Sequence, residues 1–252
     1  MKLLLTIFRS VIAYGLFTIL CALFFFPVLL LCLIPARWCA SSTFSSGIVA
    51  SVAHYFYKGA LFCSLLRIRY EGVKNIPEGP VIFVANHQSA LDIPLLGVLA
   101  GRMTHLWLAT TWLLHSPIFR LVLPRACALI DTQTQFKAMR SLLYAIKLVN
   151  NGHKGHVLMF PEGGRFTDGT VHEFYAGFVV LAKETKRPIV PVYIDGVSQA
   201  YPPSAFLVQN YPITVTIGKP LYFNEEEMSD KELKNMVYSW FVSMANQSSQ
   251  AV

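Results

Sequence analysis

Short apolar runs recur along most of the chain, and stretches with helical spacing separate several of them. Strand-like runs of four to six residues, most of them wholly apolar, fall at residues 81–85, 106–109, 126–130, 157–160, 189–194 and 213–217. Residues 67–73 alternate like an edge strand. Helical spacing links the apolar positions 136, 139, 142, 143, 146 and 149, and also residues 233–244. Strands that alternate with helices predict an α/β fold, with a mostly parallel twisted sheet flanked by helices.

The N-terminal quarter has a different pattern. Residues 10–36 carry no charge and lie between Arg9 and Arg37, so 27 residues exceed the roughly 20 that cross a bilayer core as a helix. A cleaved signal peptide usually has a shorter apolar region and a small-residue cleavage site, so a retained membrane-embedded helical segment is favoured. Residues 48–66 predict a partner helix at the membrane interface. The predicted division is a membrane-anchoring segment at 1–66 and an α/β domain at 67–252.

Composition and charge agree with a membrane-associated protein. The 252 residues are 54% hydrophobic and only 14% charged, so the chain has more apolar surface than its own core requires. The net charge of +7 suits anionic lipids, phosphate-bearing substrates or acidic carrier proteins. Nucleic acid is not predicted as a partner, because no basic run is interleaved with aromatics. Five cysteines without a C-x-x-C pair favour free thiols over disulfides or zinc ligands.

The first candidate site lies in "VIFVANHQSALDIP", residues 81–94, where an apolar run ends at Asn86 and His87. One interpretation makes Ser89 the N-cap of a helix and Asp92 its capping carboxylate, with His87 a polar loop residue. The other makes His87 a general base held by Asp92. Residues five apart on an ideal helix point about 140° away from each other, so the pair can meet only if His87 lies in a loop. In that case backbone N–H groups near Ser89 are candidates for stabilising an oxyanion.

The second candidate site is "PEGGRF", residues 161–166, directly after the predicted strand 157–160. Ligands bind beyond the carboxyl ends of parallel strands, so this segment and His87 are predicted at the same rim of the sheet. Gly163 and its neighbour Gly164 allow backbone N–H groups to turn toward an anion, and Arg165 can bind phosphate oxygens. Glu162 could accept from a substrate hydroxyl. The alternative is a turn in which Glu162 and Arg165 form a solvated ion pair.

"NHQSALD", "FPEGGR" and "IVPVYI", in this order, resemble motifs of the glycerolipid acyltransferase family that includes 1-acylglycerol-3-phosphate acyltransferases. The resemblance covers about residues 70–220. It implies that His87 is the general base, that Asp92 orients it, and that Glu162, Gly163 and Arg165 bind the glycerol phosphate of the acceptor. The chain departs from the family at three positions, since Gly164, Thr132 and Thr111 stand where Thr, Arg and Lys are common.

The resemblance also implies the reaction. We expect a membrane-associated O-acyltransferase that takes a fatty acyl chain from acyl-CoA or acyl-carrier protein, without cofactor or metal. The leading acceptor is 1-acylglycerol 3-phosphate; glycerol 3-phosphate, a lyso-ornithine-type lipid and a catalytically silent lipid-binding protein are the alternatives. Pro191 is implied on the acyl-binding side, and soluble donors imply a site on the cytoplasmic face. His153 and His156 are predicted to have surface or strand-start roles. Ser229 and Glu232 form a capping box that predicts the start of the last helix.

Overall fold

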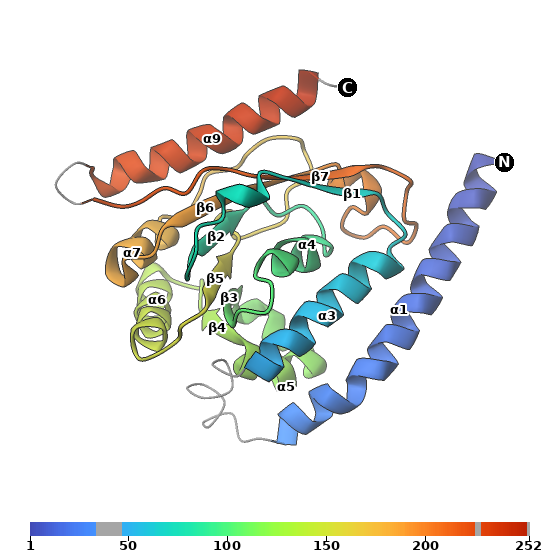
Figure 1. Cartoon of the computed structure of the whole chain (residues 1–252), viewed down its shortest axis with the longest axis horizontal. Helices are drawn as coiled ribbons and strands as arrows, with labels where there is room; N and C mark the ends of the chain where they lie inside the picture. Colours follow the sequence, from blue (N-terminus) through green and yellow to red (C-terminus); the bar gives the residue numbers. More distant parts are fainter. Residues whose placement is uncertain (34–46, 225–227, 251–252) are drawn as a thin grey trace.

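The computed structural model describes residues 1–33, 47–224 and 228–250 of the chain (Figure 1). Within these residues a seven-stranded sheet has the order β1-β7-β6-β2-β5-β3-β4. Neighbouring strands are parallel except for the antiparallel pair β6 and β7. The strands are β1 (Ile68–Glu71), β2 (Ile82–Ala85), β3 (His105–Thr110), β4 (Cys127–Ile130), β5 (His156–Met159), β6 (Ile189–Asp195) and β7 (Ile213–Ile217). The α/β prediction is confirmed, with β1 at an edge as its alternation indicated.

Helices cover both faces of the sheet, and each face has its own core. The helices are α1 (Lys2–Leu33), α3 (Gly47–Cys63), α4 (Asp92–Leu99), α5 (Pro117–Ala126), α6 (Gln135–Asn150), α7 (Gly177–Thr185), α8 (Val197–Ala200) and α9 (Asp230–Gln250), with short 3-10 helices η2 (Val73–Asn75) and η3 (Thr111–His115). Helices α6, α7 and α9 pack on one face, and α3 and α4 on the other. Parallel strands buried in this way read as continuous apolar runs, which explains why they could be found in the sequence.

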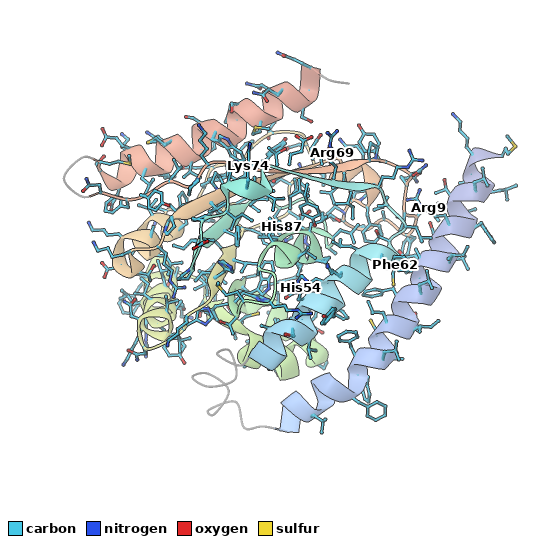
Figure 2. All side chains as sticks on the ribbon, viewed as in Figure 1. Arg9, His54, Phe62, Arg69, Lys74 and His87 are labelled. Carbon is cyan, nitrogen blue, oxygen red and sulfur yellow. The ribbon has the colours of Figure 1, made fainter. Side chains whose placement is uncertain are left out.

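The N-terminal helix α1 lies beside α3 (Figure 1), where Phe24 packs edge-on against Phe56 with ring centroids 5.3 Å apart. Its stretch Lys2–Phe26 is long and apolar enough to cross a membrane by length and composition, and little of it is buried. Helix α1 begins at Lys2, before the uncharged stretch 10–36, so Arg9 lies inside the helix. The Arg9 side chain points toward the α/β domain (Figure 2), where it donates to the Gln209 carbonyl. Residues 34–36 of the predicted anchor lie outside the described residues.

The first half of α1 is also hydrogen-bonded to the α/β domain. The backbone N–H of Val208 donates to Ser10 Oγ at 2.9 Å, and the hydroxyls of Tyr14 and Tyr201 are 3.1 Å apart. These contacts join residues almost two hundred positions apart. The N-terminal segment therefore packs directly on the domain that carries the candidate site, while many of its other side chains are exposed. Those exposed side chains include Leu3, Leu4, Leu5, Phe8 and Val11.

Helix α6 corrects one detail of the predicted core. Leu142, Ile146 and Val149 are buried against the sheet, as their spacing predicted. Phe136 and Leu143 have the same helical spacing but are exposed. Spacing identifies positions on a common side of a helix, whereas the width of the covered strip depends on what packs against it.

Candidate active site

The candidate site lies at the carboxyl ends of β2 and β5, which are neighbours in the sheet. Asn86, the first residue after β2, fixes the position of the chain there. Its side-chain amide donates to the Ile194 carbonyl at 2.8 Å and accepts from the Ile194 N–H at 2.7 Å. This pair of bonds ties the end of β2 to β6. His87 follows directly and lies near the centre of the view in Figure 2.

His87 and Asp92 meet, because the loop between them turns back before α4 begins. His87 Nδ1 is 2.8 Å from Asp92 Oδ2. The same oxygen accepts the backbone N–H groups of Gln88 at 2.5 Å and Ser89 at 2.7 Å, and Asp92 is completely buried. A carboxylate only accepts, so we assign the His87 proton to Nδ1, which leaves a lone pair on Nε2. The N–H groups of Gln88 and Ser89 donate to Asp92, so these two candidates from the sequence are not available to an oxyanion.

The two interpretations of this stretch turn out to be compatible. Helix α4 begins at Asp92 and Leu91 precedes it, so the prediction that Ser89 occupies the N-cap is wrong. Asp92 nevertheless takes the Ser89 N–H as the acid of a capping box does, and the Leu91 N–H donates to Ser89 Oγ at 3.3 Å. The Ser89 hydroxyl itself donates to the Tyr201 carbonyl at 2.5 Å. One buried carboxylate thus fixes the turn and holds the histidine.

The loop after β5 binds both backbone groups of His87. The His87 N–H donates to Glu162 Oε1 at 3.2 Å, and the Phe166 N–H donates to the His87 carbonyl at 3.1 Å. Glu162 is only 6% exposed, and this burial raises the pKa of its carboxyl to about 7, although the backbone N–H groups of His87 and His172 act in the opposite direction. The two segments predicted at one rim are therefore joined through His87.

Arg165 does not form the solvated ion pair that the alternative required. No ion pair joins Arg165 to Glu162 among the described side chains. Arg165 Nε instead donates to His87 Nε2 at 3.3 Å. The Phe160 ring stacks on the imidazole, with centroids 4.0 Å apart and planes 7° apart. The imidazole is thus held by Asp92 at one nitrogen, by Arg165 at the other and by Phe160 on one face.

The two glycines of this loop have different reasons to be glycine. Gly163 has φ +68°, in the left-handed region, and a Cβ there would lie 2.8 Å from the Tyr175 ring. Gly164 has no such φ, but a Cβ there would come within 3.2 Å of the Phe166 ring. That ring stacks on His172 at 3.7 Å, and His172 Nε2 is 2.7 Å from Asp168 Oδ2. The absence of the family's Thr at position 164 therefore leaves room for Phe166.

Sequence reasoning missed Phe160, Phe166, Asp168 and His172 as neighbours of the site. The only available signal was the D-x3-H spacing of Asp168 and His172 within one loop, which is weak by itself. The aromatic residues gave no signal, because the pattern of β5 and its loop does not indicate which ring turns toward His87.

Pro191 lies apart from this cluster. It is buried in β6 opposite Val84, on the face covered by α9, and lines a cavity of about 950 Å³ with Trp240. None of His87, Asp92, Glu162, Gly163 or Arg165 lines this cavity. The structure therefore brings His87, Asp92, Glu162, Gly163 and Arg165 into one region but not Pro191, whose role on the acyl-binding side stays a prediction.

Metal ligands do not gather in the described parts of the chain. No group of three or more His, Cys, Asp or Glu side chains could hold a metal ion there. The described groups at the rim include the imidazole, its carboxylate partner, a buried carboxyl of raised pKa and a guanidinium. Together they suit proton transfer beside an anion-binding group.

Comparisons with known proteins agree with this site. Residues 67–195 match the family model described as Acyltransferase, so the chain belongs to the acyltransferase family. It is 26% identical over 174 residues, 66% of this chain and 48% of the relative, to a chloroplastic 1-acyl-sn-glycerol-3-phosphate acyltransferase of Brassica napus. It is also 26% identical over 178 residues, 69% of this chain and 67% of the relative, to the 1-acyl-sn-glycerol-3-phosphate acyltransferase of Pseudomonas aeruginosa.

The alignments to the plant relatives span about half the length of those proteins. The fold has a solved counterpart, the crystal structure of the 1-acyl-sn-glycerophosphate acyltransferase PlsC from Thermotoga maritima, with a TM-score of 0.73. That similarity covers 98% of this chain and 97% of the other at 23% sequence identity. It shows that the N-terminal helices and the sheet form one shared architecture.

Proposed function

We propose that this chain moves a fatty acyl group from a thioester to the free hydroxyl of 1-acylglycerol 3-phosphate, giving phosphatidic acid. The observation that carries the proposal is the arrangement around His87, with Asp92 Oδ2 2.8 Å from Nδ1 and Arg165 Nε 3.3 Å from Nε2. A base and an anion-binding group are thus adjacent, as an acceptor with a hydroxyl and a phosphate requires. The names of the relatives from Brassica napus and Pseudomonas aeruginosa support the same acceptor.

The reaction can be written from these groups. A hydroxyl is a poor nucleophile near neutral pH, so neutral His87 takes its proton at Nε2 as the oxygen attacks the thioester carbonyl carbon. The carbon–sulfur bond then breaks, and the leaving thiolate takes the proton back from the imidazolium. Asp92 fixes the tautomer and stabilises the imidazolium, as the carboxylate does in a catalytic triad. The substrate supplies the hydroxyl, so the mechanism needs no covalent enzyme intermediate.

The acceptor phosphate is assigned to the loop after β5. Arg165 is exposed and offers the planar pair of donors that matches two phosphate oxygens, and Gly163 permits the backbone turn beside it. Glu162 is committed to the His87 N–H, so its part in the proposal is to hold the backbone that carries the base. Such positioning matters, since displacement of a base by about 1 Å can cost roughly 100-fold in rate.

A membrane location and a soluble donor complete the proposal. The apolar exposed side of α1 gives the domain a surface that favours lipid over water. Acyl-CoA or acyl-carrier protein is the donor, which puts the site on the cytoplasmic face of the membrane. The excess of basic over acidic residues favours both anionic lipids and these negatively charged donors.

The proposal is tested with purified full-length protein in detergent and a panel of acceptors against one acyl-CoA. The panel contains lysophosphatidic acid, glycerol 3-phosphate and a lyso-ornithine lipid, with products identified by mass spectrometry and His87→Ala as the inactive control. We expect phosphatidic acid as the main product. A larger rate with either other acceptor would show that the acceptor is wrong. Vesicle binding without any transfer would favour a silent lipid-binding protein.

A further inference from the structure

Arg165 occupies the atom that the reaction uses. Its Nε–H donates to His87 Nε2, the nitrogen that must take the proton of the acceptor hydroxyl. Arginine has only donors, so the bond uses the lone pair of the imidazole. Because Nδ1 donates its own proton to Asp92, Nε2 is the single basic position of the ring. In this arrangement His87 cannot accept a proton from any hydroxyl.

A stronger partner could replace His87 in its contact with Arg165. Arg165 is exposed and makes no ion pair with a described carboxylate, so its guanidinium lacks an anionic partner within the described part of the chain. At 3.3 Å the bond to Nε2 is longer than the usual N–H donor distance. A phosphate would offer the same guanidinium two charge-assisted bonds, each about twice as strong as a neutral one. An anion should therefore displace the imidazole from Arg165.

We propose that Arg165 determines acceptor specificity by blocking the base until an anionic headgroup draws it away. This inference rests on the proposed function, since the anion is taken to be the phosphate of the lysolipid. Phosphate and hydroxyl belong to one molecule, so the base becomes free when the correct nucleophile is in place. Water and uncharged lysolipids lack the anion, and they meet a base whose lone pair is occupied.

The contact between Arg165 and His87 should also protect the thioester of the acyl donor from hydrolysis. Hydrolysis requires the oxygen of water to attack the carbonyl carbon while His87 Nε2 takes a proton; the carbon–sulfur bond then breaks, and the thiolate leaves with that proton. This reaction needs the same lone pair. A guanidinium left beside the imidazolium would also oppose the positive charge that develops there, whereas a bound phosphate neutralises it. Hydrolysis should thus stay slow as long as Arg165 is on Nε2.

The first test is the release of CoA by full-length protein in detergent without any acceptor. We expect Arg165→Ala to raise this hydrolysis by roughly three- to tenfold, the ratio that one net hydrogen bond of this kind contributes, while transfer to lysophosphatidic acid falls. The wild type should prefer lysophosphatidic acid over monoacylglycerol in kcat, and the variant should lose most of that preference. Arg140→Ala, on the exposed side of α6, is the matched control and should change neither rate.

The second test measures how accessible the lone pair of His87 is to a reagent, and it needs no acyl transfer. Diethyl pyrocarbonate modifies an unprotonated imidazole nitrogen, and mass spectrometry locates the modified His87. We expect Arg165→Ala to be modified at His87 roughly three- to tenfold faster than the wild type or Arg140→Ala. Equal modification rates, or hydrolysis that does not rise, would overturn the blocking role of Arg165. Faster modification and hydrolysis in the variant, with no transfer to lysophosphatidic acid by the wild type, would support the block and refute the proposed acceptor.

Discussion

Histidines lie at both the amino ends and the carboxyl ends of parallel strands in the sheet, and their surroundings differ. At the amino ends of β3 and β5 the rings of His105, His153 and His156 are buried and bonded mainly to backbone groups. The Val81 N–H, for example, donates to His156 Nδ1 at 3.2 Å. At the carboxyl ends, His87 is bound by a buried carboxylate on one nitrogen and by an exposed guanidinium on the other. The first arrangement uses the ring as a structural connector, and the second leaves it a position that a substrate can take over.

The titratable groups at the amino ends and at the carboxyl ends of the strands also differ in their pKa values. Burial lowers the pKa of His156 to about 4 and that of Arg187 to about 10, so the histidine at the amino end stays neutral. At the carboxyl end, burial raises the pKa of Glu162 to about 7, so one group changes charge near physiological pH. A buried histidine bonded mainly to backbone groups thus indicates a structural role. A histidine between a buried carboxylate and an exposed cation indicates chemistry.

The largest expected effect is a loss of acyl transfer when the histidine at the carboxyl ends of the strands is replaced. We expect His87→Ala to lower acyl transfer by roughly 10²- to 10⁴-fold, the usual contribution of a general base, while its melting temperature stays close to that of the wild type. The imidazole is partly accessible and its loss leaves the backbone bonds of the loop intact. Turnover of purified protein and thermal unfolding are the measurements. Near-native turnover would refute the mechanism.

A substitution at the amino ends of the strands should instead lower stability and leave activity unchanged. Arg187 donates to the carbonyls of Gly155 and His153, at 2.6 Å for the first, and it is buried. Arg187→Ala leaves both carbonyls without these donors, so we expect the free energy of unfolding to fall by about 2–5 kcal/mol. Activity per folded molecule should be unchanged, since the site is at the other end of the strands.

Urea unfolding in detergent measures this loss, and Arg140→Ala is the matched control because its side chain is exposed. A stability equal to that of the control would show that the amino-end cluster does not stabilise the sheet. A lower turnover per folded molecule would show that the two ends are coupled.

Sequence reasoning found what depends on local pattern. The strands could be predicted because both faces of the sheet are covered, and Ser229 and Glu232 exchange the capping bonds that their spacing predicted. His87 and Asp92 could be paired because a strand, a loop and a helix start allow only a short path between them. Each of these features joins residues that are close in sequence.

The remaining features depend on contacts across the fold. Phe160, the first residue after β5, stacks on His87, and Arg165 contacts the same ring from the loop that continues from Phe160. Neither contact can be predicted from the spacing of apolar residues in the sequence. Pro191 is near the rim along the chain, but side chains alternate along a strand, and its own points to the α9 face. Motif order therefore predicted the region of the site but not the partners of each atom.

The pH dependence of stability should have opposite signs at the two ends. Glu162 has a pKa of about 7 in the fold against an ordinary 4.5, so the native state holds the proton more tightly and stability falls as pH rises from about 4.5 to 7. His156 has a pKa of about 4 against 6.5, so its contribution is lost as pH falls through that window. Glu162→Gln cannot ionise and should remove the first effect.

We expect Glu162→Gln to exceed the wild type in stability at pH 8 by about 3 kcal/mol, because the pKa of Glu162 is about 7 in the fold against 4.5, and to come close to it near pH 4.5. Urea unfolding at both pH values measures the difference, with Glu78→Gln on an exposed turn as the control. A difference that does not depend on pH would mean that Glu162 is charged throughout.

The smallest effect tests what the carboxyl end binds. Arg forms a planar bidentate contact with phosphate that Lys cannot reproduce. We therefore expect Arg165→Lys to raise the KM for lysophosphatidic acid by roughly tenfold, or about 1.4 kcal/mol, with a much smaller change in the KM for the acyl donor. Steady-state kinetics with each substrate varied in turn separates the two constants. Unchanged kinetics with lysophosphatidic acid, together with high activity on an uncharged lysolipid, would leave His87 as the base but assign this rim to a different acceptor.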